Sequence, residues 1–542
     1  MSINTYDEVP YPSSSFPQTH PVKLATMAWL FGLAPTAPER SKVLELGCAD
    51  GANLIPIAQA YPGATFVGID SSSRQIERGQ QAISGSGLSN ISLRHDDILT
   101  YDAAGQKFDY IIVHGIFSWV AEAVRERILS LCDTLLTENG VAYVSYNALP
   151  GWHMRGAIRD MMLFHTAQFS DVQQRIGQSR ALVKFLADSI PADNNPYGQF
   201  LKNELTAMQG WQDGYLRHDF LEEENKAFYF HEFVSAAARH NLQYLGEPDL
   251  SSMLASNFPQ QVQETLGKVG RNIIQMEQYM DFLRNRMFRM TLLVKTDAKI
   301  IRNIDATTLR EFHIGAVARS VKDDVSLMVG EKEEFRLANG VTFSSDSPLV
   351  KAVLLCLQQS APNHVTFAAL VSEVRAKLLT GTSATREPGL EKREEAVIAQ
   401  QLLLLYSKGL IDVLAVPHVR LAAANDSALK ATAFMRWQAL NEPRHVTNLR
   451  HVSVRVDPFA RHVLSLMDGT RNLDQLTDGM AAKVDEGLFN VQESGKSVSD
   501  RERLKLILTP RVSGVVDQLA KLSFLQSAGW LEKLRPVTGA PE

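Results

Sequence analysis

The residues best suited to chemistry lie in one short stretch of the chain, between positions 43 and 53. An apolar run, Val43–Leu46, is typical of a buried strand and carries one acid, Glu45. It leads into a turn with two glycines, Gly47 and Gly51, which allow a sharp bend or a close approach of backbone to ligand. The apolar run over 54–60 predicts a helix. A strand, a small-residue turn and a helix in this order are typical of a nucleotide-binding site.

A second acid follows where such sites place one. The run Phe66–Ile69 predicts the next strand, and Asp70 ends it, about twenty residues after the turn. In doubly wound folds an acid at this position hydrogen-bonds the ribose hydroxyls of the nucleotide. The ligand is therefore expected to contain a ribose, and Ser71 is expected beside it.

The spacing of the turn argues against a dinucleotide. Dinucleotide sites use G-x-G-x-x-G, so that backbone N–H groups face a pyrophosphate. Here the pattern is Glu45-x-Gly47-x-Ala49-x-Gly51, and its leading carboxylate would repel a diphosphate but attract a cationic amino group. The pattern resembles motif I of class I S-adenosylmethionine (SAM) dependent methyltransferases, with Ala49 replacing the middle glycine. SAM has a ribose, an adenine, a sulfonium and an α-amino group, but no phosphate.

Three more strands are expected, at Ile91–His95, Phe108–Val113 and Val141–Tyr146. Five strands alternating with helices predict an α/β, Rossmann-like domain that binds its ligand at the carboxyl ends of the strands. Glu45, Asp70, Asp97 and His114 all fall at such ends.

In class I methyltransferases an acid after the third strand accepts a hydrogen bond from the adenine amino group, and the next apolar residue covers the ring. Asp97 with Ile98 fits this role best, and Asp96 is the alternative. The resemblance implies these cofactor-binding residues: Glu45, Gly47, Cys48, Ala49, Gly51, Asn53, Asp70, Ser71, Asp96, Asp97, Ile98, His114 and Trp119.

Composition changes divide the rest of the chain. Residues 1–40 are Pro-rich with scattered aromatic side chains, which favours a lid over the cofactor; the alternative is a poorly ordered terminus. Residues 41–150 are expected to form the SAM-binding domain, 151–300 a mainly helical middle domain, and 301–345 a linker.

Residues 346–542 contain a weak internal repeat. Ser347-Pro348 and Asp457-Pro458 each predict a helix start, with a capping side chain and a proline in the first turn. Each is followed by further helices and a short apolar strand, which indicates two winged-helix-like units. No Lys/Arg cluster marks a recognition helix, so contact with protein is favoured over nucleic acid.

The overall composition narrows the functional class. The chain has 542 residues, of which 45% are hydrophobic and 21% charged, as in globular proteins of several domains. A net charge of −5 gives no global attraction to nucleic acid or anionic membranes. The three cysteines are widely separated, and no signal peptide or membrane-spanning run is present, so a cytoplasmic location without membrane insertion is expected.

Two other sequence motifs are interpreted as structural and not as functional sites. The sequence His231-Glu232-Phe233-Val234-Ser235 lacks the second histidine of the H-E-x-x-H zinc motif, so no metal is expected. Arg284–Arg286 with Arg289 is expected to form a solvated helix face.

Motifs along most of the chain resemble one methyltransferase family. They include Tyr6–Tyr11, Thr19-His20-Pro21, Ser118-Trp119-Val120, Pro150-Gly151-Trp152 and the segment 277–286. The chain is similar in these to bacterial methyltransferases with a methyltransferase regulatory domain, whose best-known members are rickettsial protein lysine methyltransferases. The resemblance implies SAM-dependent methylation of lysine side chains in a protein partner. A small-molecule N- or O-methyltransferase and a non-enzymatic SAM-binding adaptor are the alternatives.

Lysine methylation adds a chemical requirement. The enzyme mainly has to align donor and acceptor, but the amine must also lose a proton, because an ammonium has no lone pair. His114, Tyr146 and the N-terminal Tyr11 and His20 are the candidate catalytic residues. Aromatic rings can flank an amine through cation–π contact.

Overall fold

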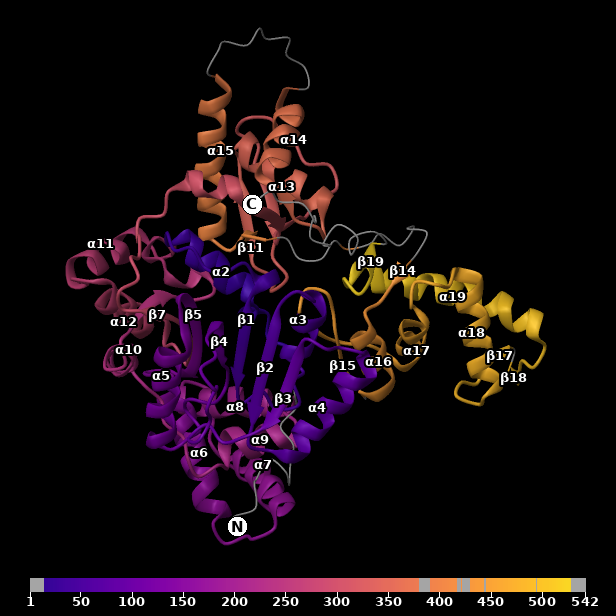
Figure 1. The fold of residues 1–542 in the computed structure, drawn as a ribbon, viewed down its shortest axis with the longest axis horizontal. Helices are drawn as coiled ribbons and strands as arrows, with labels where there is room; N and C mark the ends of the chain where they lie inside the picture. The colour runs from indigo at the N-terminus through magenta and orange to yellow at the C-terminus, as the bar shows by residue number, and fades with distance from the viewer. Residues whose placement is uncertain are drawn as a thin grey trace.

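One seven-stranded sheet, in the order β3-β2-β1-β4-β5-β7-β6, forms the centre of the protein (Figure 1). The computed structural model describes residues 14–379, 390–416, 421, 429–442, 445–493 and 495–527. Five neighbouring strands pair in parallel and confirm the predicted Rossmann-like fold. They are β1 (Lys42–Leu46), β2 (Thr65–Asp70), β3 (Ile91–His95), β4 (Phe108–Val113) and β5 (Leu136–Asn147).

Helices cover both faces of this sheet. On one face lie α2 (Pro21–Leu30), α3 (Leu54–Ala60) and α4 (Ser73–Ser86), and on the other lie α5 (Glu122–Leu135) and α10 (Phe230–Ala238). Because side chains alternate along a strand, Val43 enters the first core and Leu44 the second. This alternation also decides which strand side chains can reach the site.

The sheet extends beyond the expected SAM-binding domain. β7 (Phe288–Lys295) pairs antiparallel with β5, and β6 (Leu242–Gly246) pairs antiparallel with β7. The expected boundary at residue 150 therefore does not coincide with an edge of the sheet. The apolar run 290–294 is typical of a strand, but its pairing with β5 is a long-range contact that periodicity does not encode.

Most of the helices expected in the middle domain lie between β5 and β7. Four of these helices form a group beyond one end of the sheet (Figure 1): α6 (Trp152–Thr166), α7 (Val172–Ser189), α8 (Pro196–Met208) and α9 (Asp213–Phe220). They share a separate apolar core. Two more, α11 (Gln260–Val269) and α12 (Ile273–Arg284), lead into β7.

Arg289 corrects one expectation from the sequence. It is fully buried, and its guanidinium donates to Glu247, Glu277 and Asp281 at 2.7–2.8 Å. Its charge also lies 3.8 Å from the centre of the Phe230 ring. Burial opposes this charge, but the three carboxylates keep the pKa of Arg289 above its ordinary range. The expected solvated helix face is wrong for this residue because β7 has already begun at 288.

Two winged-helix-like units complete the chain. In the first, β8 (His313–Ala316) lies between β12 (Val365–Thr366) and β13 (Ile411–Leu414). Its helices are α13 (Pro348–Ser360), α14 (Phe367–Leu379) and α15 (Leu390–Ser407). The expected linker is more structured than predicted, because it supplies β8 and a small sheet of β9 (Arg319–Ser320), β10 (Glu333–Arg336) and β11 (Thr342–Ser345).

The second unit packs α16 (Ala433–Asn441) against α4. A hairpin of β15 (His445–Thr447) and β16 (Ser453–Arg455) follows, and then α17 (Pro458–Leu466), α18 (Leu473–Asp485) and α19 (Arg501–Lys521). Two short strands, β14 (Leu429–Lys430) and β19 (Gln526–Ser527), pair at its base.

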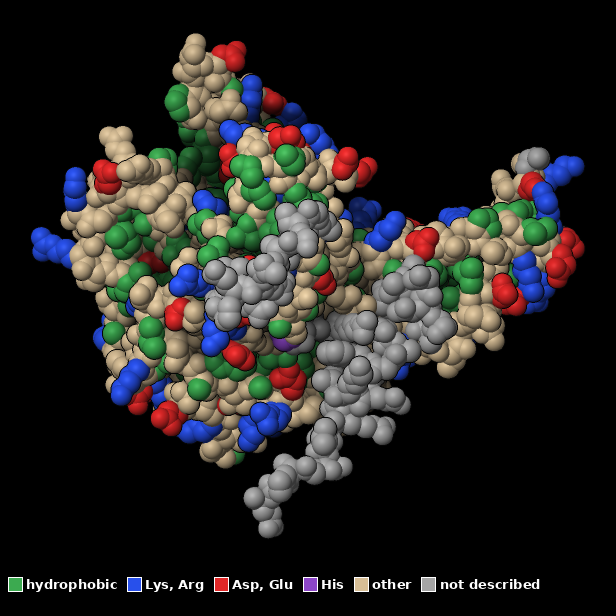
Figure 2. All heavy atoms as spheres, turned by 90° about the horizontal axis from the view of Figure 1, so that it is seen from above, with side chains coloured by type: hydrophobic (Ala, Val, Ile, Leu, Met, Phe, Trp, Pro, Cys, Tyr) green, Lys and Arg blue, Asp and Glu red, His purple; other side chains and the backbone are tan. Residues whose placement is uncertain are grey.

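The surface of this second unit carries charges of both signs. Figure 2 shows acidic and basic side chains interspersed on the arm that projects from the body. Ion pairs Arg503–Glu493 and Lys505–Asp478 lie on it. Within the described ranges, no helix combines the length and apolar character needed to cross a bilayer.

The predicted N-caps of both units are confirmed. Ser347 accepts from the backbone N–H of Val350, and Asp457 accepts from those of Phe459 and Ala460. These bonds satisfy N–H groups that the first helical turn leaves without partners.

We expect Arg289→Met to lower the free energy of unfolding by about 3–5 kcal/mol at pH 8, because it leaves three buried carboxylates without a cation. Urea denaturation of the full chain measures this loss. The loss is expected to shrink as the pH falls toward 7, because burial raises the pKa of Glu277 to about 7 and a protonated Glu277 costs less to bury without its arginine.

The matched control is Arg239→Met, which removes an arginine that is 62% exposed and pairs with Glu126 at the surface. Its expected cost is under about 1 kcal/mol. Equal effects of the two substitutions would contradict the role assigned to the buried network.

Candidate active site

The turn between β1 and α3 has the backbone that its small residues predict. Gly47, Ala49 and Gly51 have left-handed φ angles of 73°, 50° and 75°. A Cβ atom on Gly47 would lie 2.5 Å from Ile116, and one on Gly51 would lie 2.7 Å from Leu93. A side chain at either position would be strained by the left-handed backbone and would have to displace Ile116 or Leu93.

Asp70 supports this turn from the end of β2. Its carboxylate accepts hydrogen bonds from the backbone N–H groups of Ala49 at 2.8 Å and Ser72 at 2.9 Å. Ser71 directly follows, and its carbonyl oxygen lies 3.0 Å from Nε2 of His95. Asp70, which is predicted to bind the ribose, is thus held in place beside motif I.

The loop after β3 lies next to Asp70 because β2 and β3 are parallel neighbours. Asp96 is half-buried and accepts from the backbone N–H of Asp97 at 2.8 Å. Asp97 is exposed and accepts from that of Leu99 at 2.9 Å. Ile98 is half-buried against the core. The structure thus brings the predicted adenine-side residues to the same edge of the sheet as the turn.

Glu45 lies buried beneath the turn. Its Oε1 atom accepts from the side-chain amide of Asn53 at 2.8 Å. Its Oε2 atom is buried and has no hydrogen-bond partner among the described residues. Burial raises the pKa of Glu45 to about 8, despite the bond from Asn53. An arriving ammonium group would satisfy Oε2 and favour the ionised carboxylate.

Asn53 joins three distant segments at this point. Its Oδ1 atom accepts from the backbone N–H of Phe16 at 2.9 Å and from Nε2 of His451 at 2.8 Å, and its Nδ2 atom donates to Oγ1 of Thr19 at 3.0 Å. Its Nδ2 atom also donates to Glu45. Nothing in the sequence singled out His451, because it lies far along the chain in a different unit.

His114 is held at the end of β4 by two hydroxyl groups. Its Nδ1 atom lies 3.0 Å from the Tyr143 hydroxyl and 3.2 Å from Oγ of Ser145. Ser145 already accepts from the backbone N–H of Gly115 at 2.8 Å, so its own hydrogen is available to His114. Burial lowers the pKa of His114 to about 4, so the ring is neutral at pH 7.

Aromatic rings surround this histidine. The ring of Phe16 lies 3.9 Å from that of His114, centre to centre, and Phe288 approaches it edge-on at 6.1 Å. The described part of the N-terminal segment therefore reaches the predicted methyl-transfer site. Tyr11 lies outside the described residues.

Tyr146 does not share this site. It points to the opposite face of β5, where it stacks on Phe233 at 4.0 Å and its hydroxyl lies 3.2 Å from that of Thr291. Strand alternation explains this, since Tyr143 and Ser145 occupy the His114 face. The location disfavours the predicted catalytic role of Tyr146 and points to Tyr143, which alternation within β5 could have identified.

The remaining predicted residues lie at the margins of this site. His20 caps α2 by accepting from the backbone N–H of Val22 at 3.3 Å, and its ring faces the interface with the second unit. Trp119 is half-buried and packs edge-on against Trp152 at 6.0 Å. Burial raises the pKa of the Cys48 thiol, which fits a small apolar residue within the turn.

Three family models match the chain. They are "Methyltransferase domain" over 43–140, "Predicted methyltransferase regulatory domain" over 212–295, and "PKMT, C-terminal winged helix domain" over 430–524. An uncharacterized protein of Rickettsia prowazekii is 38% identical over 528 residues, which cover 96% of this chain and 94% of the relative.

The solved structure of PKMT2 from Rickettsia typhi in complex with AdoHcy is similar throughout. It matches with a TM-score of 0.82 and 31% identity, over 95% of this chain and 100% of PKMT2. This chain belongs to the methyltransferase family of PKMT2. A second structure of PKMT2 matches at 32% identity with a TM-score of 0.81. The chain is therefore a SAM-dependent methyltransferase, and SAM is its methyl donor.

The residues around the turn fit this cofactor. The unpartnered Oε2 of Glu45 suits the α-amino group. Asp70 and Asp97 remain the predicted residues for the ribose and the adenine. When bound, SAM supplies an electrophilic methyl group on its sulfonium.

We expect SAM binding to release up to about one proton from Glu45 at pH 7. The free carboxyl is protonated there because its pKa is about 8, and the ligand ammonium favours its ionised form. Calorimetric titration in phosphate and in Tris measures the proton release.

In Glu45→Gln this release is expected to disappear and SAM to bind about tenfold more weakly. Glu77→Gln, on the exposed side of α4, is the matched control and is expected to bind like wild type. Equal proton release by Glu45→Gln and wild type would refute the assignment.

Proposed function

We propose that this chain transfers methyl groups from SAM to the ε-amino groups of lysine side chains in a protein substrate. The likeness to PKMT2 over 95% of the chain carries this proposal, together with the resemblance of the sequence motifs to protein lysine methyltransferases. The likeness includes the helical group and the C-terminal units, which a methyl transfer to a small molecule does not itself require.

The surroundings of His114 suit an uncharged amine. Burial in a site of low polarity disfavours an ammonium, so a lysine that enters it loses its proton more readily. A ring whose own pKa is about 4 holds a proton weakly, so we assign His114 to hydrogen bonding and alignment rather than to storing the proton. Tyr143 and Ser145 fix the ring for this task.

Phe16 and Phe288 add an aromatic lining to the same place. Aromatic faces attract cations by about 0.5–2 kcal/mol, which suits the positive charge of the reacting groups. Phe288 is 38% exposed, so this side of the lining is open to solvent. We assign Phe288 to the entrance for the acceptor side chain.

We expect His114→Phe and Tyr143→Phe to lower kcat by about 10- to 100-fold, because the acceptor loses its alignment. The affinity of Tyr143→Phe for AdoHcy is expected to stay within about threefold of wild type, since neither the turn nor a predicted cofactor-binding residue is changed. Steady-state kinetics and calorimetry give the two quantities.

Tyr146→Phe is the matched control, because it removes a hydroxyl from the other face of the same strand. It is expected to keep near-wild-type kcat. A large loss in Tyr146→Phe with none in Tyr143→Phe would contradict the site.

The acceptor is tested with SAM that carries a tritiated methyl group, added to the enzyme and a lysate of the source organism. We expect acid-stable label on protein, recovered as methylated lysine after hydrolysis and absent with Glu45→Ala. Label confined to small molecules would overturn the proposal and identify a metabolite methyltransferase.

A further inference from the structure

We infer that His451, in the second C-terminal unit, is a positioning residue of the cofactor site. It holds the side chain of Asn53 in the orientation that directs its amide at Glu45. The inference rests on SAM binding and not on the identity of the acceptor.

The first step is the placement of His451. It lies in the loop between β15 and β16, has a left-handed φ of 60°, and its backbone N–H donates to the carbonyl of Asn448 at 3.0 Å. Its side chain is buried, and its Nε2 atom lies 2.8 Å from Oδ1 of Asn53. The hairpin thus delivers one hydrogen-bond donor to motif I.

The second step is the protonation of this ring. Burial lowers the pKa of His451 well below its ordinary range, so the ring carries a single hydrogen at neutral pH. Oδ1 of Asn53 can only accept, so that hydrogen must lie on Nε2. The contact is therefore a defined donor–acceptor pair.

The third step is the orientation of the Asn53 amide. Oδ1 also accepts from the backbone N–H of Phe16, a donor that cannot be reversed. A flipped amide would place its NH2 group against this N–H. The Phe16 N–H therefore selects the orientation in which Nδ2 supports the carboxyl group, and His451 adds a second bond to Oδ1 that holds the amide there.

A second link from the same unit reaches the other side of the turn. Glu442, at the end of α16, forms an ion pair with Arg78 of α4, and Nε of Arg78 lies 3.7 Å from Oδ2 of Asp50. The backbone N–H of Phe434 donates to Gln59 on α3 at 2.9 Å. The unit is therefore anchored to the helices that flank motif I as well as to the turn.

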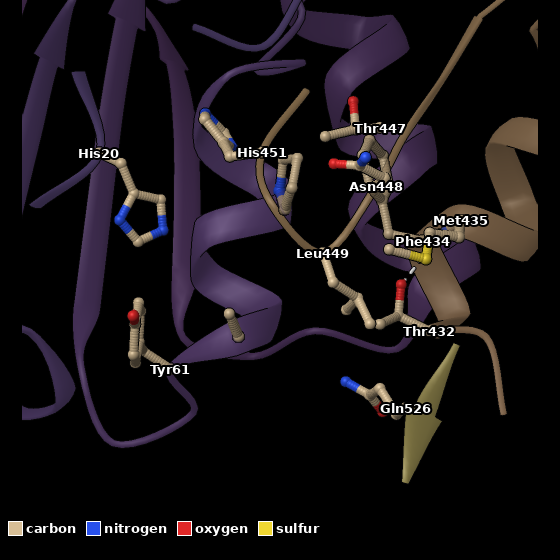
Figure 3. Close-up of a pocket in the computed structure, with 12 residues that line it drawn as sticks. His20, Tyr61, Thr432, Phe434, Met435, Thr447, Asn448, Leu449, His451 and Gln526 are labelled. Atoms are coloured by element: carbon tan, nitrogen blue, oxygen red, sulfur yellow. Dashed lines mark hydrogen bonds between the residues drawn. The ribbon is translucent and has the colours of Figure 1, made fainter. Parts of the chain in front are cut away.

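Figure 3 shows where the hairpin meets the SAM-binding domain. His451 and His20 lie on facing sides of a small pocket, and their ring centres are 5.3 Å apart. Thr447, Asn448 and Leu449 line it from the hairpin side. The close packing leaves His451 little freedom, as a positioning role requires.

The test compares AdoHcy affinity by calorimetry in His451→Phe and His451→Gln. The phenylalanine keeps a ring without a donor, and we expect it to weaken binding about three- to tenfold. The glutamine amide can donate to Asn53, so this variant is expected to bind within about twofold of wild type. His445→Phe, at an exposed position of the same hairpin, is the control with no expected change.

A double-mutant cycle separates positioning from a general structural effect. In an Asn53→Ala background, His451→Phe is expected to cause no further loss of AdoHcy affinity. If His451→Phe does not fold, His451→Ala replaces it with the same expectations. Unchanged affinity in the variant without a donor, an equal loss in His451→Gln, or additive losses in the cycle would each overturn the inference. AdoHcy binding requires no acceptor, so these results are independent of the lysine assignment.

Discussion

The side-chain amide of Asn53 is the interaction on which the cofactor site depends. It is buried, and it connects motif I with the N-terminal segment, with the acid of β1 and with the C-terminal hairpin. Buried polar groups are stable only when they are paired. One amide here satisfies donors from two chain segments outside the SAM-binding domain. The geometry of the turn is therefore tied to parts of the chain that do not themselves form the Rossmann-like sheet.

One carboxylate oxygen of the site, Oε2 of Glu45, has no hydrogen-bond partner among the described residues and can receive one from the ligand. Glu45 receives a hydrogen bond on one oxygen, while burial of the other raises its pKa. This arrangement is unfavourable for an ionised carboxylate alone and favourable for one that meets a cation. Strand alternation then separates two tasks within β5. Tyr143 faces His114, whereas Tyr146 packs in the opposite core.

Local patterns predicted much of this structure. The strand, turn and helix around motif I, the acid at the end of β2 and the caps at Ser347 and Asp457 follow from residue type and short-range spacing. The features that were missed depend on contacts distant in sequence. Pairing of β7 with β5 buried Arg289, and the hairpin brought His451 to Asn53. Neither contact leaves a periodic signal in one sequence. The placement of Tyr146 is different, because alternation along β5 already puts its side chain on the face opposite Tyr143 and Ser145.

Hydrogen exchange measured by mass spectrometry on the full chain and on Asn53→Ala tests the central claim most directly. If this amide joins the three segments, exchange should rise together in peptides covering 14–22, 45–53 and 445–455, and AdoHcy should protect them less than in the wild-type chain. Faster exchange confined to peptides around residue 53, with the N-terminal segment and the hairpin unchanged, would contradict the account.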